Sequence, residues 1–353
     1  REPVATYVEN AQRAGKHGGG PQTLADAARR HRRGADARVR AIPRPCGPRL
    51  RVVLLTLALI ALGRAADAQD LEPRAYVNTP VGLNFLIAGY GYLAGGVATD
   101  PALPLENADI KVHSALLAYA RSLDVWGMSG KVDVVVPYAG LSGSAEVMGQ
   151  SRERAVSGFA DPRLRFSVNF YGAPALSLPE FARYQQDVII GASLQVSAPL
   201  GQYDADKLVN LGTNRWSVKP ELGIGKALGP WRFELSTGVT LYTNNHDFFG
   251  GKTRAQAPIY SVQGHVSYDV GAGLWVAVDG TYYTGGRTTV DGVEGNDLQN
   301  NTRLGVTVAL PVHRSTSIKL YGSTGVSTRT GSDFDAVGIL VQPIWGVLAD
   351  RSG

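Results

Sequence analysis

From about residue 81 to residue 345, the chain repeats stretches in which apolar and polar side chains alternate. In the stretch Asp161–Phe170, Leu164 and Phe166 lie on one face, and Arg163 and Arg165 lie on the other. A period of two residues is the signature of a β-strand whose two faces meet different surroundings. The pattern predicts an all-β chain of about twelve strands, over residues 81–95, 108–122, 130–140, 159–170, 187–199, 215–227, 231–242, 258–270, 274–284, 301–311, 316–327 and 335–345.

The connectors between these strands alternate in length. Short links such as 228–230 and 271–273 alternate with long, Gly-rich links at 201–214, 244–257 and 285–300. Short turns at one end and long loops at the other are typical of an up-and-down bacterial outer-membrane barrel. An even number of strands places both termini at the periplasmic end. The link 171–186 is an exception, because it is long where a short turn is expected.

A soluble sandwich or propeller is the alternative fold, because periodicity does not tell whether the apolar face points inward. Three features favour a transmembrane barrel. The strands are longer than the ~5–6 residues usual in soluble proteins, and the face opposite the apolar one carries charges in mid-strand. Aromatic residues also gather near strand ends, as in interfacial girdles. They are Tyr90, Tyr92, Trp126, Tyr138, Trp216, Trp231, Tyr242, Tyr282, Tyr283 and Trp345. Burial of Phe166, Leu235 and Val262 between two stacked sheets would contradict the barrel.

Charge is distributed unevenly along the chain. Residues 1–68 hold 13 Lys and Arg against 5 Asp and Glu, whereas residues 69–353 hold 22 against 25. The net charge of +5 therefore belongs to the N-terminal segment, and it does not indicate a nucleic-acid partner.

The N-terminal segment predicts export. Arg49 and Arg51 precede the apolar run 52–62, and Ala66-Asp67-Ala68 is a small-x-small cleavage site. We therefore expect a signal peptide over 49–68, cleaved after Ala68, with a buried helix as the alternative. Residues 1–48 are expected to be a non-native or disordered extension, although a basic functional tail is also compatible with them. The barrel is expected over 69–346, with a C-terminal tail at 347–353.

The sequence carries few signals of an enzyme. It lacks GxSxG, HExxH and CxxC, and its histidines show no ligand spacing. No catalytic residue, metal or cofactor is therefore predicted. A barrel hydrolase is the least favoured alternative, because His265 and Ser267 share a strand face that otherwise has the character of a lumen.

Charged side chains on the polar strand faces are the better candidates for function. They are Arg163, Arg165, Lys219, Glu221, Arg232, Glu234, Asp279 and Arg303. Such charges in a narrow lumen must pair or stay hydrated, so they set either a structural ion network or selectivity. A twelve-strand barrel is expected to be constricted, so passage would depend on loops or on an inward-folded segment.

Two aromatic loop stretches are candidates for solute capture, or else ordinary girdle and turn residues. They comprise Asn214, Arg215 and Trp216, and Asp247, Phe248 and Phe249. In the last predicted strand, Pro343 has no N–H for a ladder and is expected to weaken the pairing.

Several motifs together resemble one family. They are Leu71–Tyr76, Asn78–Gly82, Tyr171–Leu176, Glu180-Phe181, Pro199–Tyr203, Asn210–Trp216, Lys219–Glu221 and Asp247–Gly251. This set resembles the outer-membrane transporter family named for the MetA pathway of phenol degradation. The resemblance implies a β-barrel that passes aromatic or other small hydrophobic molecules.

We therefore expect a passive channel in the bacterial outer membrane for small hydrophobic or aromatic compounds. Its expected partners are outer-membrane lipid, those solutes and the outer-membrane assembly machinery. The main alternative is a closed barrel with a structural or surface-interaction role and no transport.

Overall fold

The computed structural model describes residues 72–96, 106–147, 150–330 and 333–346. The predictions for the extension 1–48, the signal peptide 49–68 and the tail 347–353 lie outside these residues. Among the described residues, no helix is both long and apolar enough to cross a membrane.

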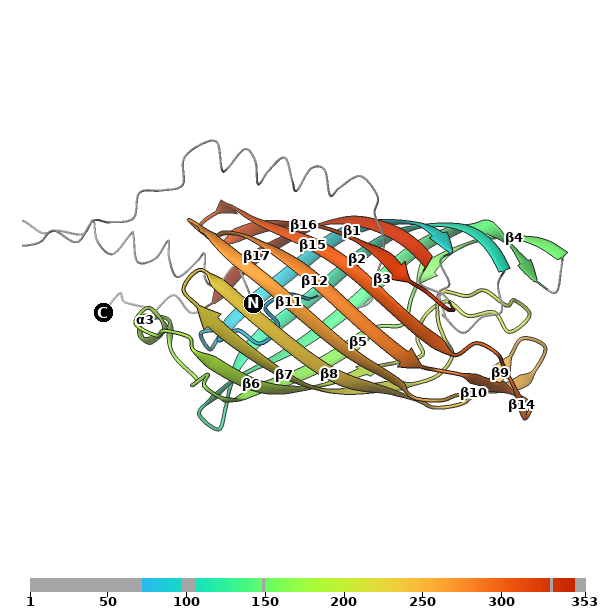
Figure 1. Ribbon diagram of the computed structural model, residues 1–353, viewed down its shortest axis with the longest axis horizontal. Helices are drawn as coiled ribbons and strands as arrows, with labels where there is room; N and C mark the ends of the chain where they lie inside the picture. The colour runs from blue at the N-terminus through green and yellow to red at the C-terminus, as the bar shows by residue number, and fades with distance from the viewer. Residues whose placement is uncertain (1–71, 97–105, 148–149, 331–332, 347–353) are drawn as a thin grey trace, which may run out of the picture.

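Twelve antiparallel strands close into one barrel, as Figure 1 shows. Pairing of β1 with β17 and of β2 with β3 completes the ring. The barrel strands are β1 (Leu83–Gly96), β2 (Glu106–Val125), β3 (Met128–Val147), β5 (Arg163–Tyr171), β6 (Val188–Ser197), β7 (Ser217–Leu228), β8 (Trp231–Tyr242), β11 (Ile259–Gly271), β12 (Leu274–Gly285), β15 (Gln299–His313), β16 (Thr316–Ser327) and β17 (Asp333–Gly346). The predicted fold class and the twelve predicted strands are confirmed.

The strand predicted over 159–170 is β5, which begins only at Arg163, and Phe159 belongs instead to a further strand, β4 (Gln150–Phe159), that the pattern did not predict. β4 pairs with the far half of β3, and β5 pairs with the near half. The break falls at residues 160–162, where Pro162 has no N–H to offer a ladder. The expected strand boundary was therefore wrong, and β3 with β4 extends well beyond the barrel wall (Figure 1).

The two ends of the barrel differ, as predicted. One end, called the turn end here, has tight connections such as Trp126-Gly127, both with positive φ (52° and 80°), which joins β2 to β3 in a two-residue hairpin. The other, the loop end, carries a small second sheet of β9 (Asn245–Phe248), β10 (Lys252–Gln256), β13 (Thr288–Val290) and β14 (Val293–Glu294). These four strands lie in links predicted as loops, and they are too short for periodicity to reveal.

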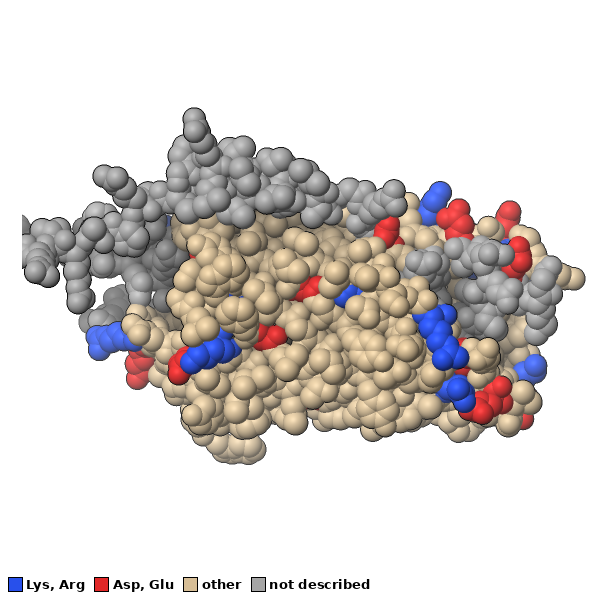
Figure 2. All heavy atoms as spheres, in the orientation of Figure 1, with Lys and Arg blue, Asp and Glu red and all other residues tan. Residues whose placement is uncertain are grey.

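Apolar side chains cover the outer surface of the barrel. Phe166, Leu235 and Val262 are 43%, 53% and 44% exposed, so no second sheet covers them. Figure 2 shows a broad middle zone almost without charged side chains, which gather toward the ends. An exposed apolar band around a closed barrel is the surface that a bilayer requires. The soluble sandwich is therefore excluded.

Aromatic girdles are present, with two corrections. Trp231, Trp345 and Trp216 are about half-exposed on the outer surface near strand ends. Tyr242 and Tyr283, predicted as girdle residues, instead line a cavity inside the barrel. The reason is strand parity, because each shares a face with inward-pointing residues of its own strand.

Pro343 interrupts one ladder without opening the barrel. The β1–β17 pairing passes from Phe85↔Ile344 directly to Ala88↔Val341, and it omits the two positions around the proline. On its other side, Pro343 pairs with Thr316 of β16. The expected weakening is therefore confined to one edge of the last strand.

Candidate lumen site

The inner wall of the barrel has a polar side and an apolar side. Strands β5 to β15 carry most of the buried polar side chains, among them Ser167, Asn169, Glu234, Ser236, Gln263, His265, Ser267, Asp279, Thr281, Asn301, Arg303 and Thr307. Strands β17, β1 and β2 with the far half of β3 carry Leu83, Phe85, Leu93, Ile110, Val112, Ala118, Ala120, Ala139, Leu141, Ala336 and Ile344. The lumen is therefore amphipathic in cross-section.

Residues 72–80, called the lumen segment here, precede β1 and lie inside the barrel. Apart from Glu72 and Ala75, the whole segment is buried although it belongs to no strand. Its residues Arg74 and Tyr76 contact inward-facing residues of β7, β8, β11 and β12. The segment therefore occupies the polar side of the lumen.

Arg74 is the deepest anchor of the lumen segment. Its guanidinium donates from Nε to Ser267 Oγ at 3.1 Å, forms an ion pair with Asp269, and lies 4.5 Å above the Trp275 ring. Its backbone N–H donates to Glu234. With about 1% of its surface exposed, Arg74 depends on these partners to offset the desolvation of its charge.

Tyr76 is the second anchor. Its backbone N–H donates to Glu234 Oε1 at 2.9 Å, and its hydroxyl donates to Glu221 Oε1 at 2.9 Å. The ring lies against the backbone of Gly223, where an added Cβ would stand 2.0 Å from the nearest ring carbon. Only glycine at this position leaves room for the tyrosine ring.

We predict that Gly223→Ala loosens the lumen segment. The new methyl group must displace the Tyr76 ring, and overpacking of this kind costs about 1–3 kcal/mol. Trypsin cleavage after Arg74 in the folded barrel should then speed up about tenfold. Gly264→Ala is the matched control, because its Cβ would meet nothing closer than 4.0 Å. Equal cleavage rates in both variants would contradict this packing.

A buried ion network joins the lumen segment to β3 and β5. Asp133 accepts from Lys131 at 2.9 Å and from Arg165 Nε at 3.1 Å. Glu72 of the lumen segment pairs with the same Arg165 and lies 3.8 Å from Lys131. Two cations and two carboxylates are thus balanced within one cluster.

Two more ion pairs surround the anchors. Lys219 pairs with Glu221 at 3.1 Å, beside the Tyr76 hydroxyl. Arg232 pairs with Asp269 at 2.9 Å, and Asp269 also holds Arg74. The charges near the turn end therefore serve mainly to seat the lumen segment.

His265 lies inside the barrel and far from lipid. Its Nδ1 is 2.7 Å from Asp279 Oδ1, and Asp279 Oδ2 accepts from Thr307 at 3.1 Å. The predicted partner Ser267 accepts from Arg74 instead. Because both residues are buried among lumen side chains, a lipid substrate on the outer surface would not reach them.

The link 172–187, which is longer than a turn needs, packs on the apolar side at the turn end. Its short helix α3 (Leu178–Phe181) brings Leu178 and Phe181 against Phe85, Ala120 and Ile344. Within the helix, Glu180 accepts from the backbone N–H and the hydroxyl of Ser177, the residue before the helix, at 2.8 and 2.6 Å, which lowers the pKa of Glu180. The extra length of the link is therefore an inserted cap.

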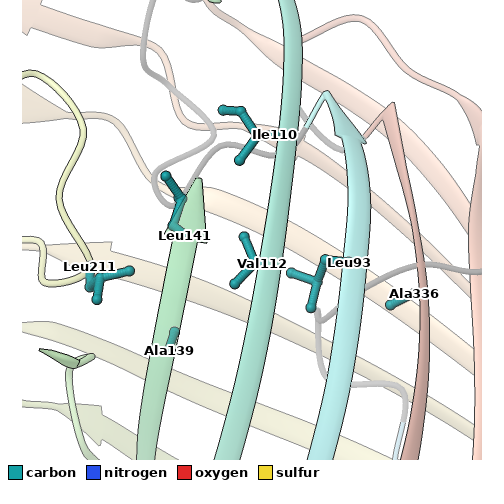
Figure 3. Packing of buried hydrophobic residues seen from close by; sticks show 7 residues of the cluster. All are labelled: Leu93, Ile110, Val112, Ala139, Leu141, Leu211 and Ala336. Carbon is teal, nitrogen blue, oxygen red and sulfur yellow. The ribbon is translucent and has the colours of Figure 1, made fainter. Parts of the chain in front are cut away.

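A loop packs on the apolar side at the loop end. Leu211, in the link between β6 and β7, belongs to the buried apolar cluster with Leu93, Val112 and Leu141 on the inner wall, and Figure 3 shows it on the side of Leu141. The loop is held there because Thr213 donates to Asp161 Oδ2 from its backbone and its hydroxyl, at 2.8 and 2.7 Å.

The predicted loop candidates do not form one site. Arg215 is buried and lies 4.5 Å over the Tyr242 ring, whereas Trp216 is exposed on the outer surface. Asn214 donates its side-chain amide to Asn245 at 3.0 Å. Asp247 on β9 and Phe249 on the β9–β10 turn are exposed, and the Phe248 ring centre lies 5.1 Å from the guanidinium of Arg254. Among these loop candidates, Arg215 contacts Tyr242, a side chain that lines a cavity in the lumen.

A cavity of about 230 Å³, called the upper cavity here, lies on the polar side. It is lined by Arg163, Gln195, Lys219, Thr240, Tyr242, Ile259, Ser261, Gln263, Thr281 and Tyr283. A smaller space of about 20 Å³ lies beside it and is lined by Glu72, Ala75 and Tyr76 together with Gln195, Lys219 and Gln263. The shared residues place the lumen segment next to the upper cavity.

The eight predicted lumen residues thus face the barrel interior, but they contact different groups there. Arg165, Glu221 and Glu234 contact the lumen segment, while Arg232 supports it through Asp269. Arg163 and Lys219 line the upper cavity. Asp279 forms a hydrogen bond with His265, and the guanidinium of Arg303 lies 4.2 Å from the centre of the Phe334 ring on β17.

Sequence reasoning missed the residues that matter most for closure, namely Arg74, Tyr76, Lys131 and Asp133. The first two lie in a segment without periodicity, and only the family motif at 71–76 marks them. Lys131 and Asp133 do alternate with Val132 and Val134, so the strand pattern could have identified them. In the described part of the chain, no group of three or more His, Cys, Asp or Glu residues could hold a metal ion.

Comparison with known proteins identifies a family and a fold. Residues 96–339 match the family described as "Putative MetA-pathway of phenol degradation". The chain is similar to the crystal structure of an outer membrane channel from Pseudomonas putida F1, with a TM-score of 0.66 and 20% sequence identity over 78% of this chain and 100% of that one. No curated protein sequence matches the chain.

More distant barrels resemble it weakly. The β-domain of the Bordetella autotransporter BrkA has a TM-score of 0.41 and 10% identity over 75% of this chain and 99% of that one. The NanC porin has a TM-score of 0.41 and 9% identity over 74% and 100%.

Proposed function

The chain belongs to the family of the MetA pathway of phenol degradation and is an outer-membrane β-barrel, and from this premise we propose that it is a passive channel for small aromatic or hydrophobic compounds. The turn end then faces the periplasm and the loop end faces outward. No cofactor takes part in passive passage.

The amphipathic lumen is the observation that carries this proposal. A porin for sugars or ions needs a hydrated wall all round, whereas this barrel has an apolar wall on β17, β1 and β2. In the middle of that wall, Leu116 and Leu340 lie over Gly89. An aromatic ring could pass along this wall while its hydroxyl groups stay in contact with the polar side.

A flux assay tests the proposal. Liposomes with the barrel should take up phloroglucinol faster than empty liposomes and faster than they take up myo-inositol, a polyol of similar ring size without an aromatic face. Phloroglucinol suits the test because its three hydroxyl groups slow its own passage through lipid. Uptake equal to that of empty liposomes would contradict a channel for aromatic compounds.

The apolar wall offers a matched pair of variants for the same assay. Leu116→Asn places an amide in the wall and should reduce phloroglucinol uptake about fivefold, since an unpartnered polar group costs about 1–3 kcal/mol to bury. Leu116→Met keeps the wall apolar at similar volume and should leave uptake within about twofold. Equal uptake by the two variants would exclude this wall as the path.

A closed barrel without transport is the second candidate, and the seated lumen segment favours it. Single-channel recording separates the two functions, because a permanently closed barrel gives no conductance steps. Conductance steps in planar bilayers that contain the purified barrel would exclude the closed form.

A further inference from the structure

We infer that the upper cavity is a binding site for a single-ring aromatic carboxylate. The inference deepens the proposed function and rests on it, because it names the solute class that this channel retains in its lumen. Three observations support it: the charge of the lining, the size and shape of the cavity, and one buried hydroxyl group.

The lining of the upper cavity is cationic. Among the described residues that line it, Arg163 and Lys219 are charged and none is a carboxylate, while Lys219 is also paired with Glu221, which lines the neighbouring space. The small space next to it is different, since Glu72, Glu221 and Glu234 line that one. Arg215, stacked on the Tyr242 ring that forms part of the wall, adds a third positive charge just behind it. Such a lining attracts an anion and repels a cation.

The rest of the lining suits an aromatic ring. Arg163 and Lys219 come from β5 and β7, whereas Tyr242, Ile259 and Tyr283 come from β8, β11 and β12 farther round the barrel. The cations and the apolar surfaces therefore come from different strands around one cavity. A cavity of about 150 Å³ holds benzene, so about 230 Å³ leaves room for one ring and a carboxylate.

The hydroxyl of Thr281 gives the site a further polar contact. Thr281 lines the cavity and is about 4% exposed, and its Oγ1 has no hydrogen-bond partner among the described residues. A buried hydroxyl without a partner carries a desolvation cost that a ligand can remove. We assign this group to a second polar substituent of the ligand, such as a ring hydroxyl.

Calorimetric titration of the detergent-solubilised barrel tests the site without any flux. Benzoate should bind at least about tenfold more tightly than benzamide, which has the same shape without charge, and more tightly than acetate, which has the charge without the ring. Equal affinity for benzoate and benzamide, or for benzoate and acetate, would overturn the assignment.

Variants locate the site. Arg163→Gln should weaken benzoate binding about tenfold, whereas Arg152→Gln, on exposed β4, should leave it within about twofold. Thr281→Val removes no hydrogen bond within the described protein, so the barrel should still resist unfolding in an unheated gel sample. It should cancel the tighter binding of 4-hydroxybenzoate relative to benzoate. An unchanged affinity in Arg163→Gln, or an unchanged hydroxyl preference in Thr281→Val, would overturn the proposed placement.

Failure of this inference and failure of the channel proposal give different results. If phloroglucinol enters liposomes but benzoate binds no better than benzamide, the channel stands and the anion site is wrong. If benzoate binds selectively but no solute enters, the site stands and the channel is wrong.

Discussion

Replacing Arg74 by alanine should raise the open probability of the barrel. The substitution removes the ion pair to Asp269, the hydrogen bond to Ser267 and the contact with the Trp275 ring. Breaking one side of a buried ion pair costs about 3–5 kcal/mol. The equilibrium between the seated and the displaced lumen segment should therefore shift by about 100-fold or more toward displacement.

Planar-bilayer recording measures this shift as open probability. The barrel wall does not depend on Arg74, so an unheated gel sample of the variant should keep the mobility of the folded barrel. Arg121→Ala is the control, because the exposed Arg121 lies between the inward-facing Ala120 and Ser122 of β2, so its side chain points away from the lumen. A folded Arg74→Ala barrel with the open probability of the wild-type chain would mean that residues 72–80 do not close the lumen.

The fold was predictable because its physical cause is local in sequence. Each residue of a membrane strand faces either lipid or lumen. The neighbours Arg163 and Leu164 therefore indicate, by a polar and an apolar side chain, which of the two each one faces. What the pattern did not predict was pairing between distant strands. It missed β4, which lies almost wholly in the stretch 141–158 predicted as a link, and it began β5 four residues early, at Phe159 instead of Arg163.

The site was less predictable, because its closure depends on segments without periodicity. The lumen segment, the cap at 172–187 and the loop with Leu211 are irregular stretches, and their contacts lie up to 195 residues away in sequence. Strand parity correctly placed Arg165 and Glu234 inside the barrel. It carried no information that their partners would be Glu72 and the backbone of Tyr76. The long link 171–186 was the one anomaly that pointed to such an insertion.

The charged residues on the polar side are also expected to decide stability, and Asp133 should matter most. Asp133→Ala leaves Lys131 and Arg165 buried with Glu72, a half-buried carboxylate on the lumen segment, as their acidic neighbour in the cluster. Loss of one partner from a buried ion cluster costs about 3–5 kcal/mol. Because Glu72 remains, we expect the free energy of unfolding to fall by about 3 kcal/mol, measured by denaturant unfolding in detergent micelles.

The matched control is a surface pair of the same chemistry. Asp187 pairs with Lys226 near the turn end, where the two side chains are 74% and 40% exposed. Water already solvates both charges there, so Asp187→Ala should cost less than about 1 kcal/mol. If both alanine variants unfold alike, the cluster around Asp133 is hydrated and adds no special stability. If only Asp133→Ala is destabilised, the cluster is a structural element of the lumen, and the selectivity of the barrel rests with Arg163 and Lys219 in the upper cavity.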